Sequence, residues 1–208
     1  NEKELYFALQ EFRIDKGNLE LQTGIHYLYL DLERIKEQFK NHYNEIFNTD
    51  ISNEEFKFPD KSEAKKAING YITCYYTPKE SDFDSYKKFK KSVRMQGSGV
   101  LNDGRILRYN GKILDPSKGE TGVNGLTAAG TNPIPIGTLA APKSIKLGSI
   151  AYVEFSENNP LNGYYKVDDR GSAINGNHFD LYTGVGKEAL NDVYKALNGQ
   201  RKATFYVF

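Results

Sequence analysis

The most informative stretch of this chain lies near its C-terminal end and reads Val167-Asp168-Asp169-Arg170-Gly171-Ser172-Ala173-Ile174-Asn175-Gly176-Asn177-His178-Phe179-Asp180-Leu181-Tyr182. Two carboxylates, Asp169 and Asp180, bracket a turn rich in Gly, Ser and Asn. Apolar residues lie beside both, so each is expected in a strand or at its rim, where partial loss of water raises the pKa of a carboxyl group. Cleavage of a glycosidic bond requires a carboxylic acid that is still protonated near neutral pH. The spacing alone also fits two aspartates that only cap turns.

The same stretch resembles the closing motif of the membrane-bound lytic transglycosylase A (MltA) family. It is also similar to the related three-aspartate (3D) domain and, more distantly, to barwin-like endoglucanases. The matching positions are Asp169, Gly171, Ala173, Ile174 and Gly176, then His178 to Tyr182, then Gly184, Val185, Gly186, Glu188 and Ala189. These families share a six-stranded double-psi β-barrel. The resemblance therefore implies a mainly β fold, with the barrel over residues 69–208 and an N-terminal, mostly helical extension over residues 1–68.

The extension has no counterpart in the families that the rest of the chain resembles. Residues 1–24 fit a short hairpin or a helix, and residues 25–47 carry an apolar stripe at helical spacing, which predicts an amphipathic helix. Its stripe is a packing face for the barrel or for a second copy of the chain. Asp60 followed by Glu63 predicts a capping box on a short helix that runs through Ile68.

The barrel segment alternates strand patterns with turn signals. Residues 69–78 are β-branched and aromatic and end at Pro78, which predicts the first strand. The dipeptide Asp103-Gly104 predicts a hairpin. The other expected elements are a Lys-rich loop or helix face at 79–93, a long loop at 115–136 on the rim of a cleft, strands at 150–155, 164–168 and 202–208, and a helix at 187–198.

Composition excludes several classes of function. The net charge of +1 argues against nucleic acid as the main partner. No apolar run approaches the roughly 18 residues of a membrane span. The single cysteine, Cys74, cannot form an internal disulfide and has no nearby His or Cys, which favours a packed thiol. His26 and His42 are too far apart for a metal pair on one helix, so we predict no metal and no cofactor. Because the chain starts at Asn1, we expect that an upstream segment was removed.

The resemblance also implies the site residues. Asp180 matches the essential aspartate of the family, which acts as the single general acid and base, and Asp169 supports it. The residues implied to bind sugar are Tyr76 and Thr77, then Gln96, Gly97 and Ser98 of a Gln-Gly-Ser-Gly motif, then Gly171, Ser172 and Ala173. Glycines let backbone N–H groups approach a ligand, and Gln and Ser side chains offer the uncharged hydrogen bonds that suit sugar hydroxyls.

Two features depart from the family pattern. Larger relatives insert a second β domain, the other wall of the cleft, between the Tyr-Tyr-x-Pro and Gln-Gly-Ser-Gly segments, and here only residues 79–95 lie between them. Ala141 stands where the first of the three aspartates would fall. Binding of long glycan strands is therefore expected to depend on the N-terminal helix or on a partner chain.

The sequence thus predicts a peptidoglycan lytic transglycosylase. It would cleave the β-1,4 bond between N-acetylmuramic acid and N-acetylglucosamine and leave a 1,6-anhydro product. Alternatives are a hydrolase on the same barrel and a non-catalytic glycan-binding or structural module. A third is a wall-degrading part of a phage-derived assembly in which residues 1–68 dock. The expected location is the cell envelope, periplasmic or secreted, or a phage-derived particle.

Overall fold

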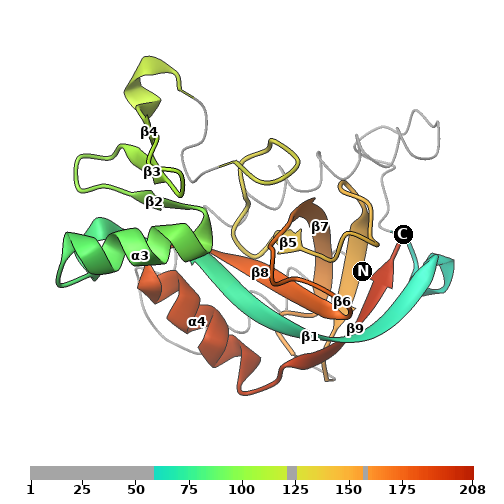
Figure 1. Cartoon of the computed structure of the whole chain (residues 1–208). Helices are drawn as coiled ribbons and strands as arrows, with labels where there is room; N and C mark the ends of the chain where they lie inside the picture. The colour runs from blue at the N-terminus through green and yellow to red at the C-terminus, as the bar shows by residue number, and fades with distance from the viewer. Residues whose placement is uncertain (1–58, 121–125, 157–158) are drawn as a thin grey trace.

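The computed structural model describes residues 59–120, 126–156 and 159–208. Six strands close into a mixed barrel in the order β1-β8-β5-β7-β6-β9 (Figure 1). They are β1 (Lys66–Thr77), β5 (Thr138–Ala140), β6 (Ile150–Glu154), β7 (Gly163–Asp169), β8 (His178–Val185) and β9 (Lys202–Val207). The elements predicted for residues 1–24 and 25–47 lie outside the described ranges, as do the docking role of that helix and both of its histidines.

Strand pairing mixes parallel and antiparallel ladders. The β1-β8 and β5-β7 pairs are parallel, whereas the β1-β9, β5-β8, β6-β7 and β6-β9 pairs are antiparallel. Side chains alternate between the two faces of a strand, and one face of each strand fills the barrel with apolar residues. Members of this core include Ile72, Leu139, Val153, Val167, Phe179, Leu181 and Phe205. The rings of Phe179 and Phe205 stack at its centre with centroids 3.7 Å apart.

The start of β1 corrects one prediction. Asp60 and Glu63 do form the predicted capping box, but the helix that they cap is a single 3-10 turn, Lys61–Glu63. The expectation of a helix through Ile68 is wrong, because β1 begins at Lys66 and pairs antiparallel with β9 from there. The ladder of interstrand hydrogen bonds overrides the local helical signal. The other strands follow the predicted ranges within a few residues.

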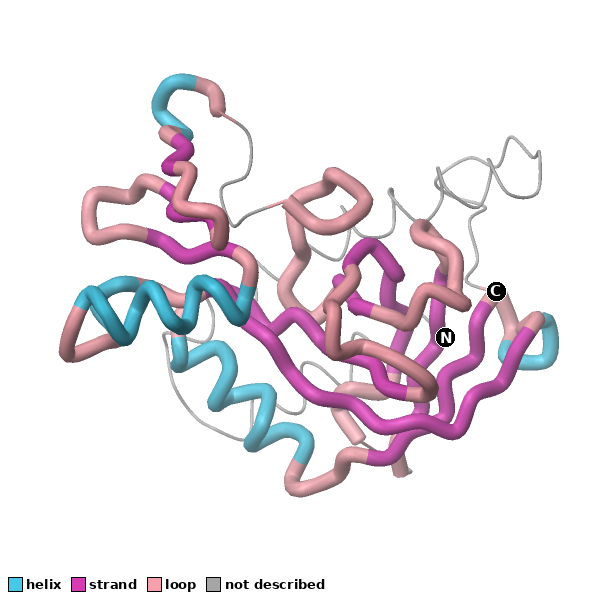
Figure 2. The backbone as a smooth tube through the Cα atoms, viewed as in Figure 1, coloured by secondary structure: helices cyan, strands magenta, loops and turns pink. Residues whose placement is uncertain are grey.

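Two α-helices within the described ranges lie outside the barrel. Helix α4 (Lys187–Leu197) follows β8, buries Val193 and Leu197 and ends at Asn198, which adopts a left-handed backbone conformation. Helix α3 (Tyr86–Gln96) is formed by part of the Lys-rich segment and buries Phe89 and Val93. Figure 2 shows α3 beside a small sheet at one end of the barrel. The sheet consists of β2 (Ser98–Val100), β3 (Ile106–Arg108) and β4 (Ile113–Leu114).

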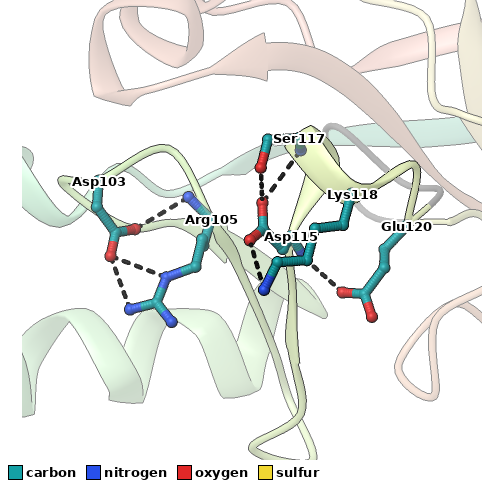
Figure 3. Close-up of polar contacts among 6 residues, drawn as sticks. All are labelled: Asp103, Arg105, Asp115, Ser117, Lys118 and Glu120. Atoms are coloured by element: carbon teal, nitrogen blue, oxygen red, sulfur yellow. Dashed lines mark hydrogen bonds and ion pairs between the residues drawn. The ribbon is translucent and has the colours of Figure 1, made fainter.

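Short-range polar contacts hold the turns of this small sheet (Figure 3). The Asp103 carboxylate accepts hydrogen bonds from the backbone and side chain of Arg105 at 3.0 and 2.8 Å, which fixes the hairpin turn predicted at Asp103-Gly104. Beyond β4, Asp115 caps the 3-10 turn Pro116–Lys118 by accepting from the backbone of Ser117 at 3.1 Å. These contacts are exposed, so they define local geometry more than they stabilise the fold.

Gly99 predicts a measurable packing constraint in this region. A Cβ atom at Gly99 would lie 2.5 Å from Val93 Cγ2 and 2.8 Å from the Phe89 ring, because β2 crosses α3 at this residue. We expect Gly99→Ala to destabilise the protein by about 1–3 kcal/mol, as overpacking does in a close-packed interior. Urea unfolding measures the change. Met95→Ala, on the exposed side of α3, is the control, and equal stability of the two variants would contradict the constraint.

Candidate active site

The candidate site is a ladder of side chains on the outer face of the barrel. Parallel pairing of β1 with β8 places three residue pairs of this face in register. The pairs are Tyr71 with His178, Thr73 with Asp180, and Tyr75 with Tyr182. Their neighbours along the strands, Ile72, Phe179 and Leu181, point into the core. The β1-β8 pair therefore has apolar side chains on its inner face and polar and aromatic side chains on its outer face.

Asp180 lies at the middle of this ladder and is partly buried. Its Oδ1 accepts a hydrogen bond from Thr73 Oγ1 at 2.6 Å. Burial raises the pKa of the Asp180 carboxyl from 3.8 to about 6, the direction expected for a carboxyl group among apolar neighbours. The Thr73 hydrogen bond and the charge of His178 lower this pKa, whereas the negative charge of Asp169 raises it. A substantial fraction of Asp180 is therefore protonated in mildly acidic solution.

His178 determines how the proton of this cluster is placed. Its Nδ1 lies 3.2 Å from the carbonyl oxygen of Ala173, which only accepts, so Nδ1 carries a hydrogen. Its Nε2 lies 2.8 Å from Thr73 Oγ1. The Thr73 hydroxyl has one hydrogen and can donate it to Asp180 or to His178, but not to both.

Two arrangements that differ by the position of a proton on Asp180 Oδ1 or on His178 Nε2 satisfy these contacts. In the first, protonated Nε2 donates to Thr73, which donates to ionised Asp180. In the second, protonated Asp180 donates to Thr73, which donates to the bare Nε2. Both hold the same number of protons, and they interconvert when two hydrogens move along the chain from His178 through Thr73 to Asp180. The cluster is not a nucleophilic triad, since Asp180 bonds to Thr73 and not to the imidazole.

Asp169 reaches the same part of the barrel from β7. Ala140 on β5 is paired with Asp180 on one side and with Asp169 on the other, so the two Cα atoms lie about 10 Å apart, two strand spacings. Asp169 accepts three hydrogen bonds, from Tyr75 Oη at 2.7 Å, Ala128 N at 2.9 Å and Arg170 N at 2.8 Å. The carboxyl group is the acceptor in each of these hydrogen bonds, so Asp169 holds the donating groups in fixed positions around the site.

The hydrogen bond from Ala128 places the long loop beside the site. Ala128 belongs to the loop predicted at 115–136, and its neighbour Ala129 donates to the carbonyl oxygen of Asp168 at 2.9 Å. Neither alanine could be identified as a site residue from the sequence, because both act through backbone N–H groups. Arg170 was also missed as an anchor, although its guanidinium donates to the carbonyl oxygen of Ala141 at 2.9 Å and to that of Ile145.

The residues predicted to bind sugar fall into two groups. At the end of β1, the side chains of Tyr76, Thr77 and Ser98 are buried, with 7%, 2% and 6% of their surface exposed. The Thr77 hydroxyl lies 2.8 Å from the Tyr182 hydroxyl, and Tyr76 N donates to Gln96 Oε1 at 3.3 Å. These contacts bring the end of β1 and the Gln-Gly-Ser-Gly motif together. The three hydroxyl side chains are buried, so a ligand at the surface does not contact them. Gln96 and Gly97 remain half-buried at the end of α3.

The other group lies in the turn between β7 and β8. Gly171, Ser172 and Ala173 are all exposed. Ala173 also has a definite role in the site, because its carbonyl oxygen accepts from His178 Nδ1 and so fixes the imidazole. The turn therefore belongs to the same surface as Asp180.

Three further features of the described ranges concern metal ligands, the cysteine and the helices. Across residues 59–120, 126–156 and 159–208, no group of three or more His, Cys, Asp or Glu side chains is placed to hold a metal ion. Burial raises the pKa of the Cys74 thiol to about 12, so it is an unreactive packed thiol. None of the described helices has the length and apolar character needed to cross a bilayer.

One family model matches part of the chain. Residues 137–207 match the model of the 3D domain, a span that begins just before β5, ends with β9 and includes both Asp169 and Asp180. This segment is therefore similar to the 3D domain. No curated protein sequence matches the chain.

Among solved structures, the chain is similar to lytic transglycosylases of the MltA type. One is Escherichia coli MltA with bound chitohexaose, at 16% identity and a TM-score of 0.46 over 67% of this chain and 71% of that one. Another is the membrane-bound lytic murein transglycosylase from Agrobacterium tumefaciens, which is 13% identical. Its TM-score is 0.49, over 74% of this chain and 81% of that one. A third is the lytic transglycosylase LtgG of Burkholderia pseudomallei, which is 18% identical. Its TM-score is 0.40, over 67% of this chain and 71% of that one. At these identities the likeness concerns the fold.

Proposed function

We propose that this protein is a lytic transglycosylase of peptidoglycan and that Asp180 is its single general acid and base. The observation that carries the proposal is the position of Asp180, a partly buried carboxyl group on the outer face of a barrel whose residues 137–207 match the 3D domain. Burial raises the pKa of this group to about 6. Such a group can give up and take back a proton near neutral pH. We assign the barrel to the double-psi class, with β1-β8 and β5-β7 as its parallel pairs.

In the proposed reaction, protonated Asp180 donates its proton to the oxygen of the bond between N-acetylmuramic acid and N-acetylglucosamine. The bond from C1 to that oxygen breaks, and ionised Asp180 then takes the proton of the muramyl C6 hydroxyl. The C6 oxygen forms the new bond to C1, which gives a 1,6-anhydro end. Each proton that leaves Asp180 returns to it, so no water is consumed. General acid–base assistance of this kind contributes about 10²–10⁴-fold.

Thr73 and His178 would supply the proton of Asp180 through hydrogen bonds. The two hydrogen-bond arrangements of the cluster allow the imidazole to pass a proton through the Thr73 hydroxyl to Asp180. In the reverse step, Asp180 is stabilised as an anion by the same hydroxyl. His178 and Thr73 are therefore positioning residues, since neither needs to touch the glycan.

Asp169 favours transglycosylation over hydrolysis by inversion. An inverting hydrolase needs a second carboxylate that is free to activate water. Asp169 instead accepts hydrogen bonds from Tyr75, Ala128 and Arg170. Attack by the substrate's own hydroxyl does not need that second base. We propose the cell envelope, periplasmic or secreted, or a phage-derived particle as the place where the protein acts.

A glycan-binding module without turnover is the second candidate. It is favoured by the burial of Tyr76, Thr77 and Ser98, which removes three of the hydroxyl groups expected to contact sugar. The same fold would then hold a glycan on its outer face without cleaving it.

Digestion of purified peptidoglycan distinguishes the candidates. We expect soluble fragments whose masses show anhydro-muramyl ends, because no water enters the proposed reaction. Reducing muramyl ends would identify a hydrolase. Protein that sediments with intact peptidoglycan and releases no fragments would identify a binding module, and both of these results would overturn the transglycosylase.

A further inference from the structure

A hollow of about 550 Å³ opens on the barrel surface beside the Asp180 ladder. It is formed by the start of β1, the start of β9, the end of β6 and the residue before β8. Its lining includes Asn69, Tyr71, Phe155, Asn177, Lys202 and Thr204. Tyr71 belongs both to this hollow and to the ladder, so the two surfaces are continuous.

Tyr71 provides an aromatic platform in this hollow. Its ring stacks on the His178 imidazole with centroids 4.4 Å apart and planes inclined by 11°. The residue is nevertheless 47% exposed, so the stack supports one face of the ring while the rest faces solvent. An exposed, rigidly held aromatic ring is a surface on which the apolar face of a sugar ring packs.

Polar atoms around the platform lack protein partners within the described part of the chain. Asn177 Nδ2 donates to the Asn69 carbonyl oxygen at 3.0 Å, and Thr204 Oγ1 donates to Asn69 Oδ1 at 3.1 Å. These bonds hold the two amides in place but leave Asn69 Nδ2 and Asn177 Oδ1 open. The ammonium group of Lys202 forms no ion pair with any described residue. The hollow thus offers amide donors, an amide acceptor and the Lys202 ammonium group. It also contains the Glu154 carboxylate, which is paired with Lys61 at 2.6 Å.

We propose that this hollow is a further glycan-binding subsite, which takes sugar units of the strand that extends beyond the bond cleaved at Asp180. This inference rests on the proposed function of Asp180. Tyr71 lies two residues before Thr73 on β1 and Asn69 lies four before it, so the platform and the amides are about 7 and 13 Å from the acid along the strand. An oligosaccharide bound at Asp180 reaches them, whereas a disaccharide does not.

The chemistry of the lining indicates which glycan fits. Amide donors and acceptors match the hydroxyl and N-acetyl groups of amino sugars, and the apolar sugar face packs on Tyr71. Lys202 adds a hydrogen-bond donor for the oxygen atoms of the lactyl group, which distinguishes N-acetylmuramic acid from N-acetylglucosamine. The subsite therefore suits strands of N-acetylated sugars.

Calorimetric titration with chitohexaose and with chitobiose tests the subsite, using Asp180→Asn protein so that no turnover occurs. We expect Tyr71→Ala to weaken chitohexaose binding about tenfold and to leave chitobiose binding unchanged. Tyr71→Phe keeps the ring and should bind both as the parent does. Tyr86→Ala is the matched control, because Tyr86 is also 47% exposed but lies on α3.

Three outcomes would overturn the subsite. One is equal chitohexaose affinity in all variants, and another is the absence of chitohexaose binding. The third is an equal loss for both sugars, which would mean that Tyr71 acts only through His178 at the Asp180 site. Digestion of peptidoglycan by wild-type protein shows whether the subsite proposal has failed or the transglycosylase proposal has failed. Anhydro products with no Tyr71 effect would reject the subsite alone, whereas Tyr71-dependent binding without such products would reject the enzyme alone.

Discussion

Asp180→Asn protein is expected to release anhydro-muropeptides from purified peptidoglycan at least about 10²-fold more slowly than wild type, because the amide cannot donate or accept the catalytic proton. The measurement is the rate of soluble fragment release, followed by mass spectrometry. Asp192→Asn is the matched control. Asp192 is an exposed aspartate on α4 that pairs only with Lys195 among the described residues, so its loss should leave the rate unchanged.

The same substitution should not unfold the protein. Asparagine has nearly the shape of aspartate, and its side-chain oxygen still accepts the hydrogen bond from Thr73. The pKa of Asp180 is about 6 in the folded protein and 3.8 as its unperturbed value, so folding favours the protonated carboxyl group. The contribution of this group to the free energy of unfolding is therefore fully present below pH 3.8 and is lost as the pH rises through about 6. At neutral pH the ionised carboxyl group therefore opposes folding, and the neutral amide removes that cost. We expect a thermal midpoint at pH 7 that is equal to or above that of wild type. Wild-type release rates in this variant would refute the assignment of Asp180.

Thr73→Val should move the alkaline limb of the activity profile to higher pH. The acid step needs protonated Asp180, so activity falls as the pH rises through the pKa of this group, about 6. The hydrogen bond from Thr73 lowers that pKa, and valine cannot make it. A hydrogen bond to a charged group contributes about 1.5–3 kcal/mol and 1.36 kcal/mol corresponds to one pKa unit, so we expect a shift of about one to two units. The profile of kcat/KM against pH measures it.

Two further variants test the cause of this shift. Thr73→Ser retains the hydroxyl group and should restore the wild-type limb. Asp169→Asn removes a negative charge that raises the pKa of Asp180, so its limb should move to lower pH. A purely structural role for Thr73 and Asp169 would lower the rate without moving the limb in opposite directions. An unchanged limb in Thr73→Val would show that its hydroxyl does not control the proton of Asp180.

Local sequence patterns were sufficient for much of the barrel. The alternation of apolar residues around Asp180 predicted a strand with a partly buried carboxyl group, and the structure confirms both. The hairpin at Asp103-Gly104 is also confirmed. Each of these features depends on a few adjacent residues, whose side-chain period and turn chemistry are visible in the sequence.

The partners of Asp180 could not be predicted, because they depend on which strands pair. Thr73 is 107 residues away from Asp180, and only the parallel register of β1 with β8 brings the two together. Burial at the end of β1 was missed for a related reason. The β1-β8 register shifts between Tyr75 and Thr77, which interrupts the alternation, and α3 covers this end of the strand through Gln96. Tyr76 and Thr77 are therefore both enclosed, although they are neighbours in the sequence.

The pairing of β1 also governs the order in which the protein can assemble. Both neighbours of β1 in the barrel, β8 and β9, are synthesised after the other four barrel strands, more than 100 residues after the strand that they flank. Until they emerge from the ribosome, β1 has two open edges, and contacts of such long sequence separation form slowly. A nascent or C-terminally truncated chain consequently has no complete proton-transfer cluster, so the capacity to cut a glycan would arise only when the last strands have closed the barrel.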